Sequence, residues 1–196
     1  MNYDLSRIRE ASTGRVSSWN TTGRNDDCWY IDPGETRILA DIEGPGAITH
    51  IWMTQKNHYR ECLLTFTWDD ASEPSVVCPL GDFFGLGHNI VNSYESSLFT
   101  ASTNQNNQFD QGCALNCYVR MPFRKRAVIA LVNESSEIHR QFFYVDYESS
   151  KDAFASDSGY FHTEFRRENP FGGWGHEIRV NSPESSIINT ERTAWE

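Results

Sequence analysis

The chain has 196 residues, of which 38% are hydrophobic and 13% aromatic, enough for one substantial core. Its 17 Lys and Arg residues against 27 Asp and Glu residues give a formal net charge of -10. This charge excludes nucleic acid and anionic membrane surfaces as expected partners. The longest apolar run, 127–132, is far shorter than the roughly 20 residues of a membrane-spanning helix. No apolar segment follows a basic one near Met1, so we expect a cytoplasmic protein.

Short stretches in which apolar and polar residues alternate recur along the chain, and this period of two is typical of half-buried β-strands. The clearest is 61–69, where every second residue from Cys62 to Trp68 is apolar. Another is 116–121, where Cys117, Val119 and Met121 are expected to point inward. In chain order we expect strands at 36–42, 48–54, 61–69, 75–79, 116–121, 126–133, 141–147, 160–166 and 177–180.

Turn-forming residues, mainly Gly, Pro and Asp, lie at 32–34, 43–46, 69–70 and 172–173. No sustained apolar stripe of helical period is present, so this is not a helical protein. The sequence therefore predicts an all-β fold, an antiparallel β-sandwich of jelly-roll type, with residues 1–196 forming a single domain.

Two segments between the predicted strands have less regular patterns. The polar tract 92–111 is long for a loop in a compact domain, which indicates either a functional loop or disorder. The segment 81–87 carries Phe83 and Phe84 between glycines. We expect a tight turn or one helical turn that exposes these rings, with a plug in the core as the alternative.

The cysteines and histidines do not form a recognisable metal motif. Five cysteines are an odd number and too few for a disulfide scaffold, so we expect them to be reduced. Cys113 and Cys117 would share one strand face about 13 Å apart, too far for one ion. The six histidines include no H-x-x-x-H or H-x-H pair. We predict no metal and no cofactor, and leave open a metal held by distant strands.

Polar residues cluster at predicted strand ends, close to aromatic rings. Sugar sites combine Asp, Asn and Arg side chains, which pair with hydroxyl groups, and rings, which pack on the C–H face. Alternatively, Asp26 and Asp27 cap a turn and Arg24 pairs with one of them. The candidate substrate-binding residues are Arg24, Asn25, Asp26, Asp82, Phe83, Phe84 and Asn116.

Catalytic residues are not identified by the sequence. G-x-S-x-G motifs and phosphate-binding loops are absent, which argues against serine hydrolase chemistry and phosphoryl transfer. Glycosidases use two carboxylates, but the spacing of side chains cannot be derived from sequence. No pair is favoured among Asp41 with Glu43, Glu164 with Glu168, and Asp26 with Asp82.

Several blocks resemble domain-of-unknown-function family 2961, which is also classed as glycoside hydrolase family 172. The resemblance covers nearly the whole chain, in ordered blocks at 17–27 (SSWNTTGRNDD), 39–52 (LADIEGPG through HIW), 79–88 (PLGDFFG with GH), 116–125 (NCY with MPFRK) and 160–170 (YFH with RRENP). The chain departs from the family pattern at Asn20 and Thr21, where Asp and Arg are common, and at Val119 and Arg120, where Phe and Pro are common.

The resemblance implies two jelly rolls per subunit, assembly as a homotrimer or homohexamer, and retaining hydrolysis of an oligosaccharide or other furanoside substrate, an α-D-fructofuranoside or α-D-arabinofuranoside. The family's two catalytic glutamates belong to G-E-G-D-D-like and S-E-D-Y-like blocks that this sequence lacks. We therefore expect the N-terminal half of a two-jelly-roll enzyme, inactive alone. The alternative is a non-catalytic jelly-roll module that binds carbohydrate or self-assembles.

Overall fold

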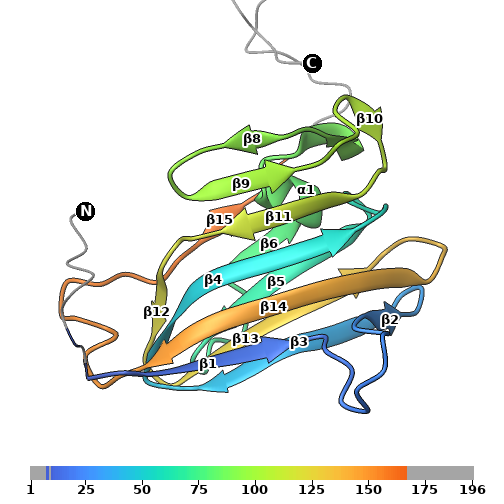
Figure 1. The fold of residues 1–196 in the computed structure, drawn as a ribbon. Helices are drawn as coiled ribbons and strands as arrows, with labels where there is room; N and C mark the ends of the chain where they lie inside the picture. The colour runs from blue at the N-terminus through green and yellow to red at the C-terminus, as the bar shows by residue number, and fades with distance from the viewer. Residues whose placement is uncertain (1–7, 9, 167–196) are drawn as a thin grey trace, which may run out of the picture. The chain divides into compact units, whose positions relative to one another are not determined.

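The computed structural model describes residue 8 and residues 10–166. Residues up to Glu164 belong to one compact unit, in which two β-sheets pack face to face (Figure 1). The strands are β1 (Ser12–Ser17), β2 (Trp29–Ile31), β3 (Thr36–Glu43), β4 (Gly46–Gln55), β5 (Cys62–Trp68), β6 (Val76–Pro79), β7 (Ile90–Val91), β8 (Tyr94–Glu95), β9 (Phe99–Ser102), β10 (Gln108–Phe109), β11 (Cys113–Cys117), β12 (Met121–Phe123), β13 (Arg126–Asn133), β14 (His139–Ser149) and β15 (Thr163–Glu164). A short helix, α1 (Leu80–Phe83), and a 3-10 turn, η1 (Gly87–Asn89), follow β6.

The two main sheets have different sizes and exchange strands along the chain. The eight-stranded sheet has the order β1-β14-β4-β11-β9-β8, with β12 paired to β4 and β2 paired to β14. The five-stranded sheet has the order β15-β6-β5-β13-β3, and β10 pairs with β7 in a small separate sheet. The connections β3–β4, β4–β5, β12–β13 and β13–β14 each pass from one sheet to the other. This confirms the predicted β-sandwich of jelly-roll type.

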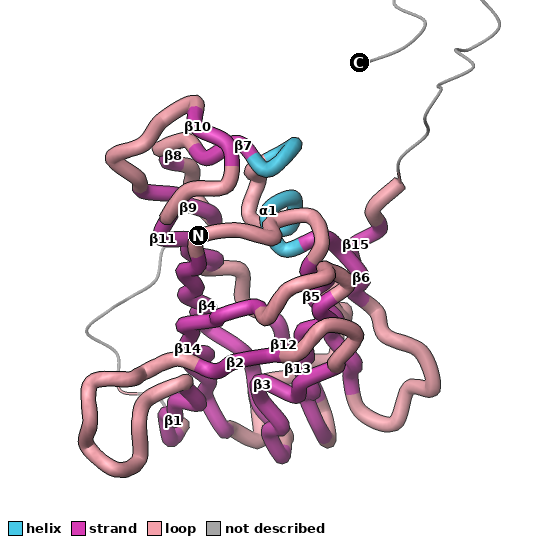
Figure 2. The backbone as a smooth tube through the Cα atoms, turned by 90° about the vertical axis from the view of Figure 1, so that its right-hand side faces the viewer, coloured by secondary structure: helices cyan, strands magenta, loops and turns pink. Residues whose placement is uncertain are grey.

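The core lies between the sheets, which Figure 2 shows as separate layers with β4 and β14 in one and β5 and β6 in the other. In β5, every second residue from Cys62 to Trp68 is buried, as its alternation predicted. The facing strand β4 contributes Ile51 and Met53, which are fully buried. Burying an apolar side chain of this size stabilises the fold by roughly 1.5–3 kcal/mol. The alternating pattern therefore defines the packing surface of each layer.

The strand predicted at 116–121 is two strands, β11 and β12, separated by residues 118–120. Asn116 and Cys117 pair with both β4 and β9, whereas Met121 pairs only with Ile48 of β4. The backbone N–H of Tyr118 donates to the carbonyl oxygen of Leu98, in register with the preceding Cys117–Phe99 pair, so the chain stays beside β9 at this point. The prediction of one strand was wrong because apolar and polar residues keep alternating through 118–120, so the sequence pattern does not show the interruption between the two strands.

The polar tract 92–111 contains β8, β9 and β10 and is not one loop. Its side chains hold the backbone in place: the amide N–H of Ser93 donates to Asn106 Oδ1 at 2.6 Å, and that of Asn107 donates to Asn92 Oδ1 at 3.1 Å. Short strands rich in Ser, Thr and Asn lack the apolar alternation on which strand prediction depends. The same reason explains why β1, with the sequence STGRVS, was missed.

Several predicted boundaries also change. The strand expected at 160–166 is limited to β15, and the turn at 43–46 joins two sheets and does not form a hairpin. The strand expected at 177–180 and the turn at 172–173 lie outside the described residues, so the single-domain prediction for 1–196 is untested there. Among the residues with described structure, no helix is long and apolar enough to cross a membrane.

Candidate functional site

The predicted sugar-binding residues lie in three separate places. Arg24, Asn25 and Asp26 occupy an exposed loop between β1 and β2. The Asp26 carboxylate lies 3.7 Å from the Arg140 guanidinium on β14 and accepts hydrogen bonds from Cys28 and Tyr30. Asp26 thus anchors its loop to the eight-stranded sheet through Arg140.

Asp82, Phe83 and Phe84 lie at α1, on the side of the five-stranded sheet. Asp82 accepts two hydrogen bonds from Arg60, at 2.9 and 2.8 Å, so its carboxylate is held in a fork-shaped ion pair. This geometry is typical of a structural pair, and the sugar-binding role of Asp82 stays a prediction.

The rings of Phe83 and Phe84 are buried, at 6% and 0% exposure. They pack edge to face with each other at 5.0 Å, and Phe83 contacts Phe66 and Phe99 in the same way. The expectation of exposed rings was wrong because these side chains fill the space between α1 and the strands. The alternative, a plug in the core, is correct.

Asn116 lies on the outer face of the eight-stranded sheet, within a row of hydrogen-bonded side chains that we call the polar ladder. Arg15 donates to both carboxylate oxygens of Asp146, at 2.6 and 2.9 Å. The His50 ring contacts Asp146 at 3.3 Å and Asn116 Oδ1 at 3.0 Å, and Asn116 Nδ2 donates to Thr100 Oγ1 at 3.1 Å. The ladder thus crosses β1, β14, β4, β11 and β9, which lie side by side in that order (Figure 1).

Aromatic rings flank the polar ladder on the same face. Trp52 stacks on Tyr144 with ring centroids 4.9 Å apart, and His50 stacks on Tyr118 at 4.6 Å. The Arg15 guanidinium lies over the Tyr144 ring at 4.1 Å. Tyr118 is 48% exposed, so one ring remains largely open to solvent. This arrangement combines ring faces with donors and acceptors, as carbohydrate recognition requires.

The charge state of Asp146 follows from its ladder partners. Desolvation of this half-buried carboxylate favours its neutral form, but the hydrogen bonds from Arg15 and His50 outweigh that effect and lower its pKa below the ordinary value. A group with a lowered pKa stays ionised at neutral pH and is a poor general acid. Asp146 can therefore accept hydrogen bonds and orient its neighbours, but it is not suited to protonate a leaving group.

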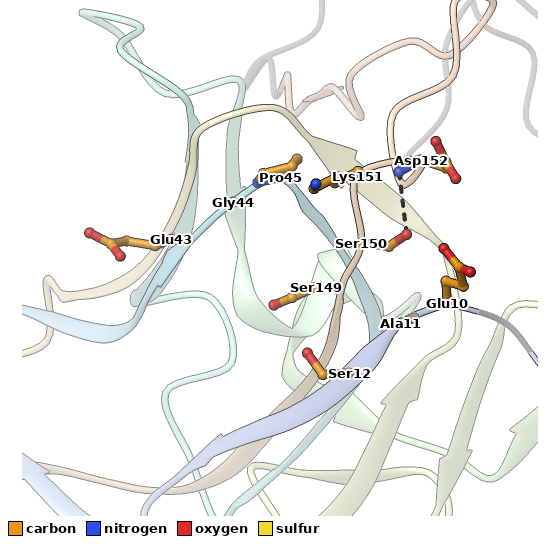
Figure 3. Close-up of a pocket in the computed structure, with 10 residues that line it drawn as sticks. All are labelled: Glu10, Ala11, Ser12, Glu43, Gly44, Pro45, Ser149, Ser150, Lys151 and Asp152. Carbon is orange, nitrogen blue, oxygen red and sulfur yellow. Dashed lines mark hydrogen bonds between the residues drawn. The ribbon is translucent and has the colours of Figure 1, made fainter.

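Two open depressions border this face along the β1–β14 pair. The depression beside the polar ladder is lined by Arg15, Asp146, Gly14, Thr13, Thr49, Tyr147 and Glu148. A Cβ atom at Gly14 would lie 2.3 Å from the Tyr147 ring, so a larger residue there would have to displace that ring. The second is lined partly by Glu10, Glu43 and Asp152 (Figure 3). Figure 3 shows Glu43 on one side of it and the other two acids on the opposite side.

The carboxylate pairs considered from the sequence do not form a catalytic centre within the described part of the chain. Asp41 is in an exposed ion pair with Arg126. Asp26 and Asp82 belong to different layers, and each has its own arginine partner. Glu164 ends β15, and Glu168 lies outside the described residues. The catalytic residues therefore remain unassigned.

A third group, which the sequence did not reveal, consists of His58, Cys62 and His139. Their potential ligand atoms all lie within 4.8 Å of one another, and all three residues are buried. The sequence contains no signal for this group, because His139 is far along the chain from the other two. The five cysteines have free thiols, and all are buried, as expected for reduced cysteines.

Comparison with protein families matches residues 24–144 to a domain described as GH172 domain-like. The match covers more than half of the chain and includes the segments that carry His50, Trp52, Asn116 and Tyr144. No curated protein matches this chain.

Proposed function

Because the chain belongs to glycoside hydrolase family 172, we propose that it supplies the substrate-positioning wall of a retaining enzyme acting on α-D-fructofuranosides or α-D-arabinofuranosides. The outer face of the eight-stranded sheet is this wall. The polar ladder pairs with sugar hydroxyls, and the rings beside it pack on the sugar's C–H surface.

The observation that carries the proposal is the combination of stacked rings and hydrogen-bonded polar groups on one sheet face. Trp52 and Tyr144 stack at 4.9 Å. The His50–Asn116 contact of 3.0 Å lies beside this stack, because His50 is two residues from Trp52 on β4 and Asn116 is the register partner of Trp52 on β11. Asn116 is the residue of this face that the sequence also indicated. Arg24 and Asn25, on their exposed loop, are available for contacts at the sugar's periphery.

We propose that the catalytic glutamates come from outside the residues described above. Retaining glycosidases need two carboxyl groups about 5 Å apart, one of them able to donate a proton. On the sugar-facing sheet, Asp146 is ionised and held by Arg15 and His50, and Glu148 is paired with Arg120 at 3.0 Å. Carboxylates held in this way support binding better than turnover. A second jelly roll, or a neighbouring subunit of a homotrimer or homohexamer, would then supply the missing pair.

A second candidate function is a binding module without turnover. It is favoured by the same ion pairs, since a face on which Asp146 and Glu148 are each paired with an arginine suits recognition of a neutral glycan. The two functions predict the same binding face and differ in whether added carboxylates complete a reaction.

The test is binding and hydrolysis of p-nitrophenyl α-D-arabinofuranoside and a difructose dianhydride by the purified chain. We expect saturable binding by titration calorimetry and no hydrolysis. Trp52→Ala should weaken binding at least tenfold, because it removes a stacking surface. Phe109→Ala is the matched control, since this ring is 62% exposed on β10 and should leave binding unchanged.

The outcomes separate the alternatives. Absence of binding by the unaltered chain would refute the wall role. Hydrolysis that Asp146→Asn abolishes would place a catalytic carboxylate on this face and contradict the proposed external source. Binding that persists in Trp52→Ala would move the sugar site elsewhere on the molecule.

A further inference from the structure

Three buried residues converge at one end of the sandwich, from elements that belong to different layers. His58 lies in the connection between β4 and β5, Cys62 is the first residue of β5, and His139 is the first residue of β14. Their exposures are 8%, 0% and 0%. Because β5 and β14 belong to the two different sheets, a bond joining these residues would connect the layers.

The distances suit a single metal ion. The Nδ1 atoms of His58 and His139 lie 3.3 Å apart. Two imidazole nitrogens bound tetrahedrally to zinc, each at 2.0–2.1 Å, lie about 3.3–3.4 Å apart. A zinc-bound thiolate would lie about 3.5 Å from each nitrogen. The Cys62 sulfur lies within 4.8 Å of both histidine ligand atoms.

The outer hydrogen bonds of the histidines leave their Nδ1 atoms directed at this position. His139 Nε2 donates to Gln141 Oε1 at 2.9 Å, so the His139 Nδ1 atom carries the lone pair. Gln141 is itself buried and is fixed by a 2.8 Å bond to the Phe142 carbonyl oxygen. On the other ring, Nε2 of His58 lies 3.1 Å from Asn57 Nδ2 and 3.9 Å from a carboxylate oxygen of Glu137. With a metal at Nδ1 this Nε2 carries the ring proton, so the Asn57 amide has to turn its oxygen toward it. Metal-bound histidines commonly direct their second nitrogen at such partners.

Without metal, one proton joins the two rings. The lone pair of His139 Nδ1 accepts the N–H of His58 Nδ1 across the 3.3 Å contact. When a divalent ion binds, the His58 proton moves from Nδ1 to Nε2, so that the ring stays neutral and Nδ1 presents a lone pair to the ion. The thiol proton of Cys62 passes to solvent. The bound ion then has two neutral imidazoles and one thiolate as ligands.

We propose that His58, Cys62 and His139 bind one Zn²⁺ ion, with a water molecule as the fourth ligand, and that this ion ties the two sheets together. Imidazole and thiolate form a borderline-soft ligand set that suits zinc, whereas magnesium and calcium require oxygen ligands. The site is buried away from the polar ladder's solvent-facing side, so its role is structural. It is independent of the proposed sugar-binding function.

The test uses the full-length chain without an affinity tag, stripped of metal by dialysis against a chelator. Zinc is titrated in competition with a chromophoric chelator, and bound metal is counted by mass spectrometry. We expect one zinc per chain, a dissociation constant below micromolar, and a melting temperature that rises with zinc concentration. Cobalt(II) should give the intense visible bands of a tetrahedral site and a sulfur-to-cobalt charge-transfer band.

Matched variants assign the ligands. His139→Gln and Cys62→Ser should weaken zinc binding at least 100-fold, and Cys62→Ser should remove the charge-transfer band. His88→Gln, an exposed histidine, and Cys113→Ser, a buried cysteine of another strand, should bind zinc as the unaltered chain does. Loss of folding in a ligand variant does not affect the cobalt spectrum of the unaltered chain. The proposal would be overturned if the unaltered chain showed no charge-transfer band or bound less than one zinc ion. It would also be overturned if the control variants lost as much zinc affinity as the ligand variants.

Discussion

At the residue scale, the charged side chains of this protein act mostly through specific partners. Asp82 and Arg60 form a two-bond ion pair with side-chain exposures of 14% and 20%. The sequence identified Asp82 as a site residue because it lies beside aromatic residues, but it could not show that the rings are buried and that the carboxylate has an arginine partner. Asn116 was identified for a similar reason and lies in the polar ladder on the outer face of the eight-stranded sheet; its role in sugar binding stays a prediction.

Asp82→Asn should lower the free energy of unfolding by about 2 kcal/mol, because removing one partner of a largely buried pair leaves the other charge poorly compensated. Sugar affinity should not change. Urea unfolding and titration calorimetry measure the two effects separately. A loss of sugar affinity with unchanged stability would instead support the sequence-based assignment of Asp82 to the substrate site.

Asp146 should make stability depend on pH in the acid range. Its pKa is lowered in the folded state, so it contributes stability above its unfolded pKa of about 3.9, and this contribution is lost as the pH falls through the folded value. Asp146→Asn should therefore be less stable than the unaltered chain at pH 7, and the difference should shrink as the pH falls below about 3.9. Thermal melting across pH 2–7 measures the difference. A difference independent of pH would show that the charge of Asp146 does not contribute.

At the scale of elements, turn residues determine where strands begin. Asp69 follows β5 in a left-handed conformation, with φ of 56°, and its Oδ1 accepts the backbone N–H groups of Arg124, Lys125 and Arg126 at 3.0, 2.7 and 3.2 Å. Its other oxygen accepts the hydroxyl of Tyr160. The sequence predicted a turn at 69–70 from composition, but the link from this turn to the start of β13 became evident only in the structure.

Replacing Asp69 with Ala should cost about 2 kcal/mol of unfolding free energy, since hydrogen bonds to an ionised carboxylate are stronger than neutral ones. Asp69→Asn tolerates the left-handed conformation and keeps one acceptor oxygen, so it should cost less. Denaturant unfolding of both variants measures which of them loses more unfolding free energy. Equal losses would attribute the effect to the negative charge that both variants remove, and not to the conformation of the turn.

At the scale of the whole molecule, stability depends on contacts between the layers. Phe84 is fully buried and, with Phe83, fills the space beside Phe99 of β9. The Tyr94 hydroxyl donates to the Phe84 carbonyl oxygen, which ties α1 to β8 of the eight-stranded sheet. Through these contacts α1 joins elements of both sheets.

Phe84→Ala should lower unfolding free energy by about 3–5 kcal/mol, because it leaves a cavity in a packed core. A change at an exposed ring, Tyr118→Ala, should have little effect on stability. Urea unfolding of the two variants provides the comparison. A small loss of unfolding free energy in Phe84→Ala would contradict the role of α1 as a core plug. The Phe84 ring would then again be a candidate for sugar contact.

The sequence by itself determined the fold class and the positions of the strands β3, β4, β5, β6, β13 and β14, because alternation within a strand is a local property that directly reflects which face is buried. It also indicated the family through ordered blocks, and Asn116 as a site residue. Only the tertiary structure decided which rings are buried, which carboxylates have arginine partners, and that His50, Asp146 and Asn116 form one ladder. It alone placed His58 and Cys62 beside His139. These relations depend on contacts between residues far apart in the chain, and the pairing of strands across two sheets, which local patterns do not specify, brings them together.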